Sequence, residues 1–198
     1  LVKTNEDADL FKLDIVSLTL GSAQGAGEYA AGYTVGMWIG PDDQHTSENF
    51  SLTQANIDLR VPVGTGIDLK LGYFGTVVGY EVYEYTDNAF FQRGLGFYME
   101  PTHHTGVLAS YQLTDDLGIT AGLVNNGGAT PNANAGGGGT AGAVTASYTT
   151  PDSLGFAGGT SIYVATVQGL DAFGTGPADF WYASIGLPTG IEGLSVDL

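Results

Sequence analysis

Residues 55–73 read ANIDLRVPVGTGIDLKLGY, two runs of alternating apolar and polar side chains around a short glycine-containing turn. Successive side chains of a β-strand point to opposite faces of the sheet, so the pattern predicts a hairpin with one apolar and one charged face. The polar face carries Gln54, Asn56, Asp58, Arg60, Asp68 and Lys70. A soluble sandwich would bury the apolar face in a core, whereas a membrane barrel would turn it toward lipid, so this stretch alone leaves both folds open.

Alternation of this kind recurs along the whole chain, in segments separated by Gly, Asp, Asn and Pro turns. The expected strand segments are 11–20, 29–40, 55–61, 67–73, 105–113, 117–123, 140–150, 155–168, 178–187 and 193–198. Short turns alternate with longer loops along much of the chain, which is typical of an up-and-down barrel. A spanning helix needs a run of about 18 apolar residues, which the sequence lacks, whereas barrel strands need only about 9–11 residues each.

Glycine supports the same interpretation, because 32 of the 198 residues are glycine and many lie inside the alternating segments. Glycine weakens a soluble strand, but in a barrel it permits bending and close approach of neighbouring strands. We therefore predict an all-β fold, an antiparallel up-and-down transmembrane β-barrel. The alternative of a soluble secreted β-sandwich stays open.

Aromatic residues cluster near the ends of the expected segments, where they would form girdles at the level of lipid headgroups. The alternative is that rings are simply favoured in strands. The residues concerned are Tyr29, Tyr73, Phe74, Tyr111, Tyr148, Phe156, Tyr163, Trp181 and Tyr182.

The whole chain, residues 1–198, is expected to form a single β-barrel domain. Its last segment, Leu194–Leu198, stops within an alternating pattern and no turn follows it. We therefore expect the barrel to be incomplete at the C-terminus and to be part of a larger one. The chain shows no secretory leader, which processing would have removed from an exported protein.

The charge balance excludes one class of partner. Five Lys and Arg stand against 21 Asp and Glu, a net charge of −16, whereas binding to a phosphate backbone requires a basic surface. Nucleic acid is therefore not an expected partner. Negative charge that lines a confined space would attract cations, although an acidic excess is also typical of proteins from salty habitats.

A series of short elements between residues 61 and 115 carries a family resemblance. The elements are VPVG at 61–64, GIDLKLGYF at 66–74, GYE at 79–81, FQRG at 91–94, PTHHTGV at 101–107 and YQLTD at 111–115. Together they resemble the β-barrel porin-2 family of Gram-negative outer membranes, over about residues 50–126. The GYE element and the spaced Arg93 and Pro-Thr-x-x-Thr-Gly elements are its most specific parts.

The resemblance implies an outer-membrane barrel that passes small solutes. It also implies that the barrel contacts outer-membrane lipid and lipopolysaccharide, and that ions or small polar solutes pass through it. Porins often assemble into trimers, so a homo-oligomer is compatible with the resemblance. Family members are usually longer than this chain, and a complete barrel of this kind ends in an aromatic residue that is absent here, in agreement with the expected incompleteness.

The charged face of the 55–73 hairpin is the first candidate site. A turn centred on Gly64 places Arg60 opposite Asp68 and Asp58 opposite Lys70, whereas a shifted register would oppose Arg60 to Lys70. We predict that Gln54, Asn56, Asp58, Arg60, Asp68 and Lys70 line a pore, where rings of charge set ion selectivity. The alternative is that the pairs only fix the register of the sheet.

The region 79–100 is the second candidate site. Its acids Glu81, Glu84, Asp87 and Glu100 surround one cation, Arg93, among several aromatic residues. We predict a constriction loop that folds into the barrel and adds negative charge there. Two alternatives remain open, an extracellular loop packed on its own aromatic residues and a calcium site made from these carboxylates.

Catalysis is not expected. The absence of Cys excludes disulfides, thiolate metal sites and Cys nucleophiles, and no hydrolase, zinc-protease or phosphate-loop spacing occurs. His103 and His104 are adjacent in an expected strand and point to opposite faces, so they are not expected to share a metal. The sequence predicts no enzyme activity, no cofactor and no metal.

Taken together, the sequence predicts an outer-membrane porin for passive diffusion of ions and small hydrophilic solutes, with a preference for cations. The alternative function is a structural or adhesive outer-membrane barrel with a plugged lumen, whose loops at Gln44–Phe50 and Asn125–Gly139 bind partners.

Overall fold

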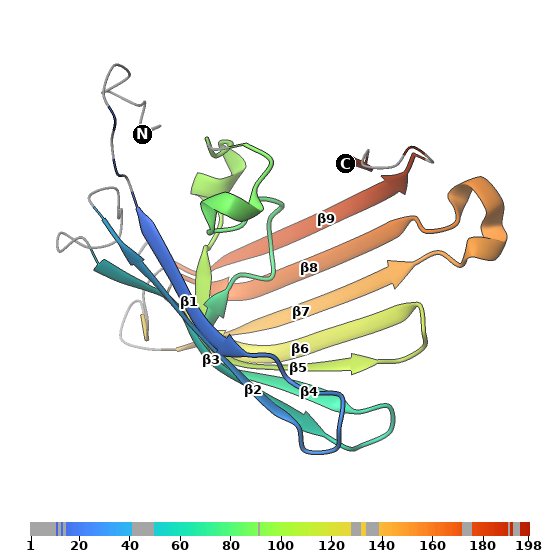
Figure 1. Ribbon diagram of the computed structural model, residues 1–198, viewed down its shortest axis with the longest axis horizontal. Coiled ribbons are helices and arrows are strands. Elements are labelled where there is room, and N and C mark those ends of the chain that lie inside the picture. Colours follow the sequence, from blue (N-terminus) through green and yellow to red (C-terminus); the bar gives the residue numbers. More distant parts are fainter. Residues whose placement is uncertain are drawn as a thin grey trace.

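The computed structural model describes residues 11, 13, 15–40, 50–90, 92–127, 132–133, 139–171, 176–189, 191 and 195–198. Its strands form one ten-stranded antiparallel sheet in which each strand pairs with its neighbours in the sequence (Figure 1). The strands are β1 Val16–Ser22, β2 Ala31–Ile39, β3 Phe50–Val61, β4 Ile67–Gly75, β5 His103–Gln112, β6 Leu117–Asn125, β7 Thr140–Thr149, β8 Ser161–Leu170, β9 Ala178–Pro188 and β10 Ser195–Asp197. This is the predicted all-β, up-and-down order, and it does not match a sandwich of two sheets.

The β3–β4 hairpin shows why the order is so regular. Gly64 and Gly66 have φ angles of +63° and +103°, which residues with a side chain rarely adopt. The turn is closed by the Gly66 backbone N–H, which donates to the Val63 carbonyl at 3.0 Å. Glycine at these two positions therefore fixes a short turn, and the short turn fixes the register of the two strands.

The sheet is curved but open. Figure 1 shows a trough whose floor is formed by the middle strands, with β1 and β9 rising at its two sides. Within the described residues β1 pairs only with β2, and β10 pairs only with β9. The fold is thus that of a porin-like barrel wall whose edges do not meet.

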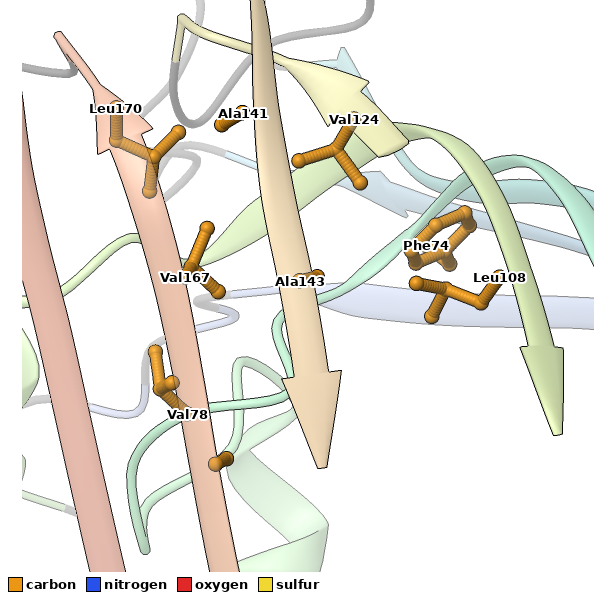
Figure 2. Packing of buried hydrophobic residues seen from close by; sticks show 9 residues of the cluster. Phe74, Val78, Leu108, Val124, Ala141, Ala143, Val167 and Leu170 are labelled. Atoms are coloured by element: carbon orange, nitrogen blue, oxygen red, sulfur yellow. The ribbon is translucent and has the colours of Figure 1, made fainter. Parts of the chain in front are cut away.

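The connection between β4 and β5 lies inside the trough. It runs from Thr76 to Thr102 and contains two short 3₁₀ helices, η1 Tyr85–Asp87 and η2 Gly96–Met99. Val78 of this loop is 3% exposed and packs against side chains of the sheet (Figure 2). The other buried members of the cluster are Phe74, Leu108, Val124, Ala141, Ala143, Ala165, Val167 and Leu170. This buried apolar cluster therefore joins the loop to the concave face.

The convex face carries a continuous apolar band. Cross-strand pairing places Ile57 beside Leu71, Leu71 beside Val107, and Val107 beside Leu123. These side chains are between 36% and 58% exposed. The band continues through Val144 and Val164 to Ile185. A soluble monomer rarely exposes an apolar surface of this extent.

The sequence-based strand boundary at residues 155–168 is wrong at its start. Asp152–Ala157 form a 3₁₀ segment, η3, and β8 begins only at Ser161. Gly155 and Gly159 have positive φ angles of +63° and +79°, which break the extended backbone. The Thr150 and Thr160 backbones hydrogen-bond across the base of this connection at 2.9 Å. The boundary was predicted wrongly because the apolar residues here follow a strand-like pattern, whereas the glycines allow the backbone to turn.

The alternation of short and long connections holds in the N-terminal part of the sheet and fails later. The turns at 62–66 and 113–116 are short and the loop at 76–102 is long, but the β7–β8 connection at 150–160 is longer than the β8–β9 connection at 171–177. The predicted loop at 41–49, and residues 128–131 and 134–138 of the predicted loop at 125–139, lie outside the described residues. None of the described helical segments is long and apolar enough to cross a membrane.

The predicted aromatic girdles are formed only in part. Tyr29, Tyr148, Phe156 and Trp181 are exposed, as a girdle requires. Tyr73 and Phe74 are only 4% and 2% exposed: Tyr73 stacks on His103, and Phe74 belongs to the buried cluster that includes Val78 of the loop. Tyr163 and Tyr182 are partly buried and pack against the core cluster. The position of an aromatic residue near the end of a strand therefore does not predict whether its ring is exposed or buried.

Candidate functional site

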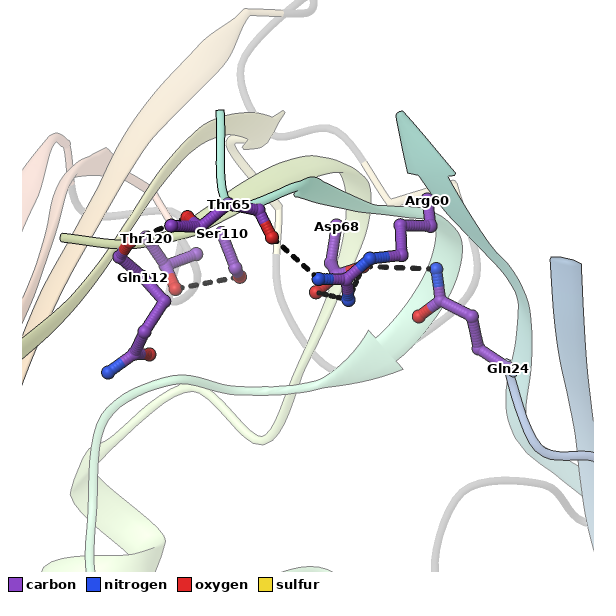
Figure 3. Close-up of polar contacts among 7 residues, drawn as sticks. All are labelled: Gln24, Arg60, Thr65, Asp68, Ser110, Gln112 and Thr120. Atoms are coloured by element: carbon purple, nitrogen blue, oxygen red, sulfur yellow. Dashed lines mark hydrogen bonds and ion pairs between the residues drawn. The ribbon is translucent and has the colours of Figure 1, made fainter. Parts of the chain in front are cut away.

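The charged side chains of the β3–β4 hairpin lie on the concave face. Leu108 packs in the cluster that contains Val78 of the loop, so Leu108 points into the trough. Ser110 is two residues further along β5 and shares that face. Asp68 is the cross-strand partner of Ser110, and the other charged residues of the hairpin alternate in phase with Asp68. Figure 3 shows Arg60 and Asp68 near the Ser110–Thr120 pair.

Two ion pairs form in the predicted register. Arg60 lies opposite Asp68 and Asp58 lies opposite Lys70. The Arg60 Nη1 atom is 3.1 and 3.0 Å from the two carboxylate oxygens of Asp68. The Lys70 Nζ atom donates to Asp58 at 2.7 Å. The cross-strand pairing predicted from the sequence is confirmed.

Neighbouring polar groups hold these pairs in place. The Asn56 amide donates to Asp58 at 3.0 Å, and Gln24, from the β1–β2 connection, donates to Asp68 at 3.2 Å. Arg60 also donates to the Thr65 carbonyl at 2.8 Å. Gln54 lies on the same strand, paired with Gly36 of β2. We call these two ion pairs, Asp58–Lys70 and Arg60–Asp68, the ladder; its charges sum to zero.

The loop at 76–102 is attached to one side of the trough through Trp38 of β2. Trp38 is 2% exposed, and its indole N–H donates to Glu84 at 2.7 Å. Its ring stacks on Tyr83 and Tyr85, with ring centroids 4.4 and 5.2 Å away. Ser17 of β1 also donates to Glu84, at 3.4 Å. Glu84 therefore acts as an anchor between the loop and the wall.

The loop is also attached to the opposite side of the trough. The Tyr163 hydroxyl of β8 donates to the Val77 carbonyl at 2.7 Å. The Tyr80 hydroxyl lies 3.4 Å from an Asp197 oxygen of β10. Contacts to β1 and β2 on one side and to β8 and β10 on the other mean that the loop crosses the trough rather than projecting from it.

Arg93 braces the inside of the loop. Its guanidinium carbon is 4.6 Å from the Tyr85 ring centroid and 4.7 Å from that of Phe97, and it donates to the Tyr83 carbonyl. Burial lowers the pKa of Arg93, and the neighbouring Tyr85 and Glu81 oppose that shift. The Glu81 carboxylate accepts the Gly94 backbone N–H at 2.7 and 3.0 Å. The loop is thus ordered by its own aromatic and charged groups as well as by the wall.

The remaining two acids of the loop are less constrained. Asp87 is exposed and accepts from Thr86 at 3.2 Å. Glu100 is partly buried against Gly79. Burial raises the pKa of Glu100 to about 7, and the charge of Glu81 adds to the rise. The ionisation of Glu100 therefore changes near neutral pH.

The two candidate groups lie at different depths of the trough. The Arg60–Asp68 pair is one residue from the β3–β4 turn, whereas the loop leaves the opposite end of β4, after Gly75. Asp68 and Gly75 are seven positions apart along the strand, a distance of about 23 Å. The structure therefore does not combine the ladder and the acids of the loop into one site.

Several residues of the site escaped the sequence analysis. Gln24, Trp38, Tyr163 and Tyr182 all reach the ladder or the loop from distant strands or turns. Tyr163 and Tyr182 were expected only as girdle residues, whereas Trp38 is the one large side chain on a face of the 29–40 segment otherwise made of Gly, Ala and Thr. The other contacts depend on the curvature of the whole sheet.

No group of three or more His, Asp or Glu in the described part of the chain is arranged to hold a metal ion. His104 contacts Thr76 at 3.0 Å and His103 contacts Thr102 at 3.1 Å, so each histidine supports one end of the loop. The calcium alternative for the loop carboxylates thus receives no support from their arrangement.

Comparison with known proteins agrees with this architecture. A family model described as "Putative beta-barrel porin-2, OmpL-like" matches residues 7–183. The chain belongs to this family. The match covers most of the chain, so the porin-2 resemblance extends well beyond residues 50–126. No curated protein and no solved structure matches the chain. Membership of the porin-2 family points to a channel role rather than to an enzyme.

Proposed function

We propose that this porin-2 protein forms a passive channel in an outer membrane for ions and small hydrophilic solutes, and that it prefers cations. The observation that carries the proposal is the acidic loop at 76–102, which crosses the concave face of the barrel wall between β2 and β8. The ladder and the loop would line the path that solutes take.

The convex face supports the membrane location. Its apolar band of partly exposed Leu, Ile and Val side chains has the alternation of a lipid-facing surface. Outer-membrane lipid and lipopolysaccharide are the partners that this surface would contact. A homo-oligomer would cover part of the same band.

The charge distribution supports a specific origin for the cation preference. The ladder is neutral, whereas the loop carries Glu81, Glu84, Asp87 and Glu100 against Arg93. Charged groups that line a narrow passage set the sign of the permeant ion. The loop, rather than the ladder, would therefore select cations.

The test is the single-channel conductance of the protein purified in detergent, in a planar bilayer under a KCl gradient. Stable ohmic steps with a reversal potential that favours K⁺ are expected. The Asp87→Asn variant should shift the reversal potential toward zero, while Asp115→Asn, which removes an exposed charge from the β5–β6 turn, should not. Anion selectivity would refute the charge assignment.

One observation favours a second function, a structural or adhesive barrel with a plugged lumen. Val77 and Val78 pack against the apolar cluster on the trough floor, so part of the concave face is sealed by the loop. Insertion into the bilayer without conductance steps would favour this function. Loss of cell contact after deletion of residues 44–50 would then identify a partner-binding loop.

A further inference from the structure

The loop and the wall of the trough border a partly open cavity of ≈ 760 Å³. Its volume falls within the range of sites that hold small organic molecules, about 300–1,000 Å³. The wall contributes Tyr182 of β9, and the loop contributes the rest of the lining. The cavity is therefore shaped mainly by the loop, and Tyr182 of the wall completes it.

The chemistry of the lining is acidic and aromatic. Its charged side chains are Glu81, Asp87 and Glu100, and no Lys or Arg lines it. Its rings are Tyr80, Phe90, Phe97 and Tyr182. Carboxylates attract a positive head group, and aromatic faces attract both cations and apolar bodies. A small anion would meet only repulsion here.

A metal ion does not fit this arrangement. The three carboxylates are described residues, yet no group of three acidic or histidine side chains in the described part of the chain is close enough to hold a metal. The negative groups are spread around a large space instead of converging on a point. The arrangement suits an organic cation, in which a charged head group is attached to a larger apolar part.

The loop already binds one organic cation, its own Arg93. The guanidinium lies 4.6 and 4.7 Å from the ring centroids of Tyr85 and Phe97, with the charge of Glu81 nearby. Phe97 and Glu81 also line the cavity. One ring and one acid near the internal guanidinium therefore also border the cavity.

We propose that this cavity binds organic cations, with an ammonium or guanidinium head among Glu81, Asp87 and Glu100 and an apolar body against the rings. The proposal names a solute class for the cation preference proposed above, and it rests on that function for the route by which the solute arrives. The cavity would slow such solutes in passage and so distinguish them from K⁺.

Isothermal titration calorimetry of the protein in detergent micelles tests the binding. The probes are phenethylammonium, its neutral analogue 2-phenylethanol and the anion 3-phenylpropionate. Phenethylammonium should bind at least about tenfold more tightly than either analogue, because only it satisfies both the carboxylates and the rings. Equal affinity for the neutral analogue would overturn the proposal.

Two double variants identify the site. At a pH above the raised pKa of Glu100, Asp87→Asn with Glu100→Gln should weaken phenethylammonium binding about tenfold, through two lost charge contacts. Asp115→Asn with Asp152→Asn removes the same charge from distant turns and should leave the affinity unchanged. Retention of affinity in the first variant, with heat-modifiable migration on gels showing that it is folded, would overturn the proposal.

Bilayer recordings on the same preparations separate this proposal from the pore function. K⁺ steps without phenethylammonium binding would overturn the cavity alone. Binding without K⁺ steps would refute the pore and leave a ligand site in a closed barrel. Short current blocks by phenethylammonium, lost in the Asp87→Asn, Glu100→Gln variant, are expected if both proposals hold.

Discussion

At the scale of single residues, adjacent residues of a strand place their side chains on opposite faces of the sheet. The Lys70 side chain is 40% exposed and is paired with Asp58 on the concave face. Leu71 is 36% exposed on the convex face, between Ile57 and Val107. Two residues of similar exposure therefore meet different solvents if one face borders water and the other borders lipid.

Single cysteines measure this difference, because the chain has none of its own. In a Lys70→Cys variant, a charged, water-soluble thiol reagent should change the conductance, since the modified side chain would lie in the aqueous path. In Leu71→Cys the reagent should have no effect, because lipid would shield the thiol. Equal reaction at both positions in liposomes would contradict a lipid-facing convex surface.

Glu100 predicts a pH dependence of ion selectivity. Its pKa is raised to about 7 by burial and by Glu81, so the carboxyl is neutral below that pH and charged above it. The preference for K⁺ should therefore rise as the pH increases through 7. The reversal potential under a KCl gradient, recorded across this range, measures the effect.

Glu100→Gln is the control for this pH dependence, and it should flatten the response. The unfolded chain binds this proton less tightly than the folded loop does, so ionisation of Glu100 also weakens the folded state as the pH rises. A response that persists in Glu100→Gln would assign the titration to another group.

At the scale of elements, the β3–β4 hairpin depends on its turn. Gly66 has a φ angle of +103°, and a Cβ atom there would lie 2.5 Å from the Arg60 Nη2 atom. Gly66→Ala should therefore destabilise the protein by about 1–3 kcal/mol, through backbone strain and a displaced Arg60. Urea unfolding in detergent measures the loss. At Gly75 a Cβ atom would meet nothing within 4 Å, so Gly75→Ala should unfold close to wild type.

The elements also show what the sequence could and could not predict. The hairpin register followed from local rules, because a turn of fixed length and opposite charges on facing positions select one pairing. The start of β8 was missed because Phe156 continues an apolar pattern while Gly155 turns the backbone. The position at which the loop docks on the sheet could not be predicted from the sequence. Trp38 and Glu84 are 46 positions apart, and they meet only because the sheet curves.

The attachment of the loop through Trp38 is directly testable. Trp38→Leu removes two stacked ring contacts and the hydrogen bond to Glu84, which should weaken loop docking by about 1–3 kcal/mol. We expect larger fluctuations of the open-channel current. Trp181→Leu is the matched control, because that ring is 74% exposed on the convex face. Identical current noise in both variants would argue against a loop held in the ion path.

At the scale of the whole molecule, the apolar band is the feature that a membrane would require. Ala121 lies in the middle of β6 on the convex face, between Ala109 and Val144. Ala121→Lys should cost about 2–4 kcal/mol in a bilayer, where the charge would enter hydrocarbon. Thr120→Lys, on the concave face, should cost only about 1 kcal/mol for the lost Ser110 contact. Urea unfolding in liposomes measures the loss of stability in both variants. A larger loss in Thr120→Lys than in Ala121→Lys would contradict a lipid-facing convex surface.

The two attachments of the loop have a consequence for the order in which the chain assembles. Pairing of neighbouring strands can proceed step by step from the N-terminus, since each new strand needs only the one before it. Val77, by contrast, must wait for Tyr163, which follows it by 86 positions. A growing wall of β1–β7 would hold its loop through Trp38 and through Val78 on the trough floor, and only the arrival of β8 would supply the attachment on the opposite side. The attachment through Tyr163 is thus a late event, and a chain stopped before β8 would leave the loop without its hydrogen bond on that side.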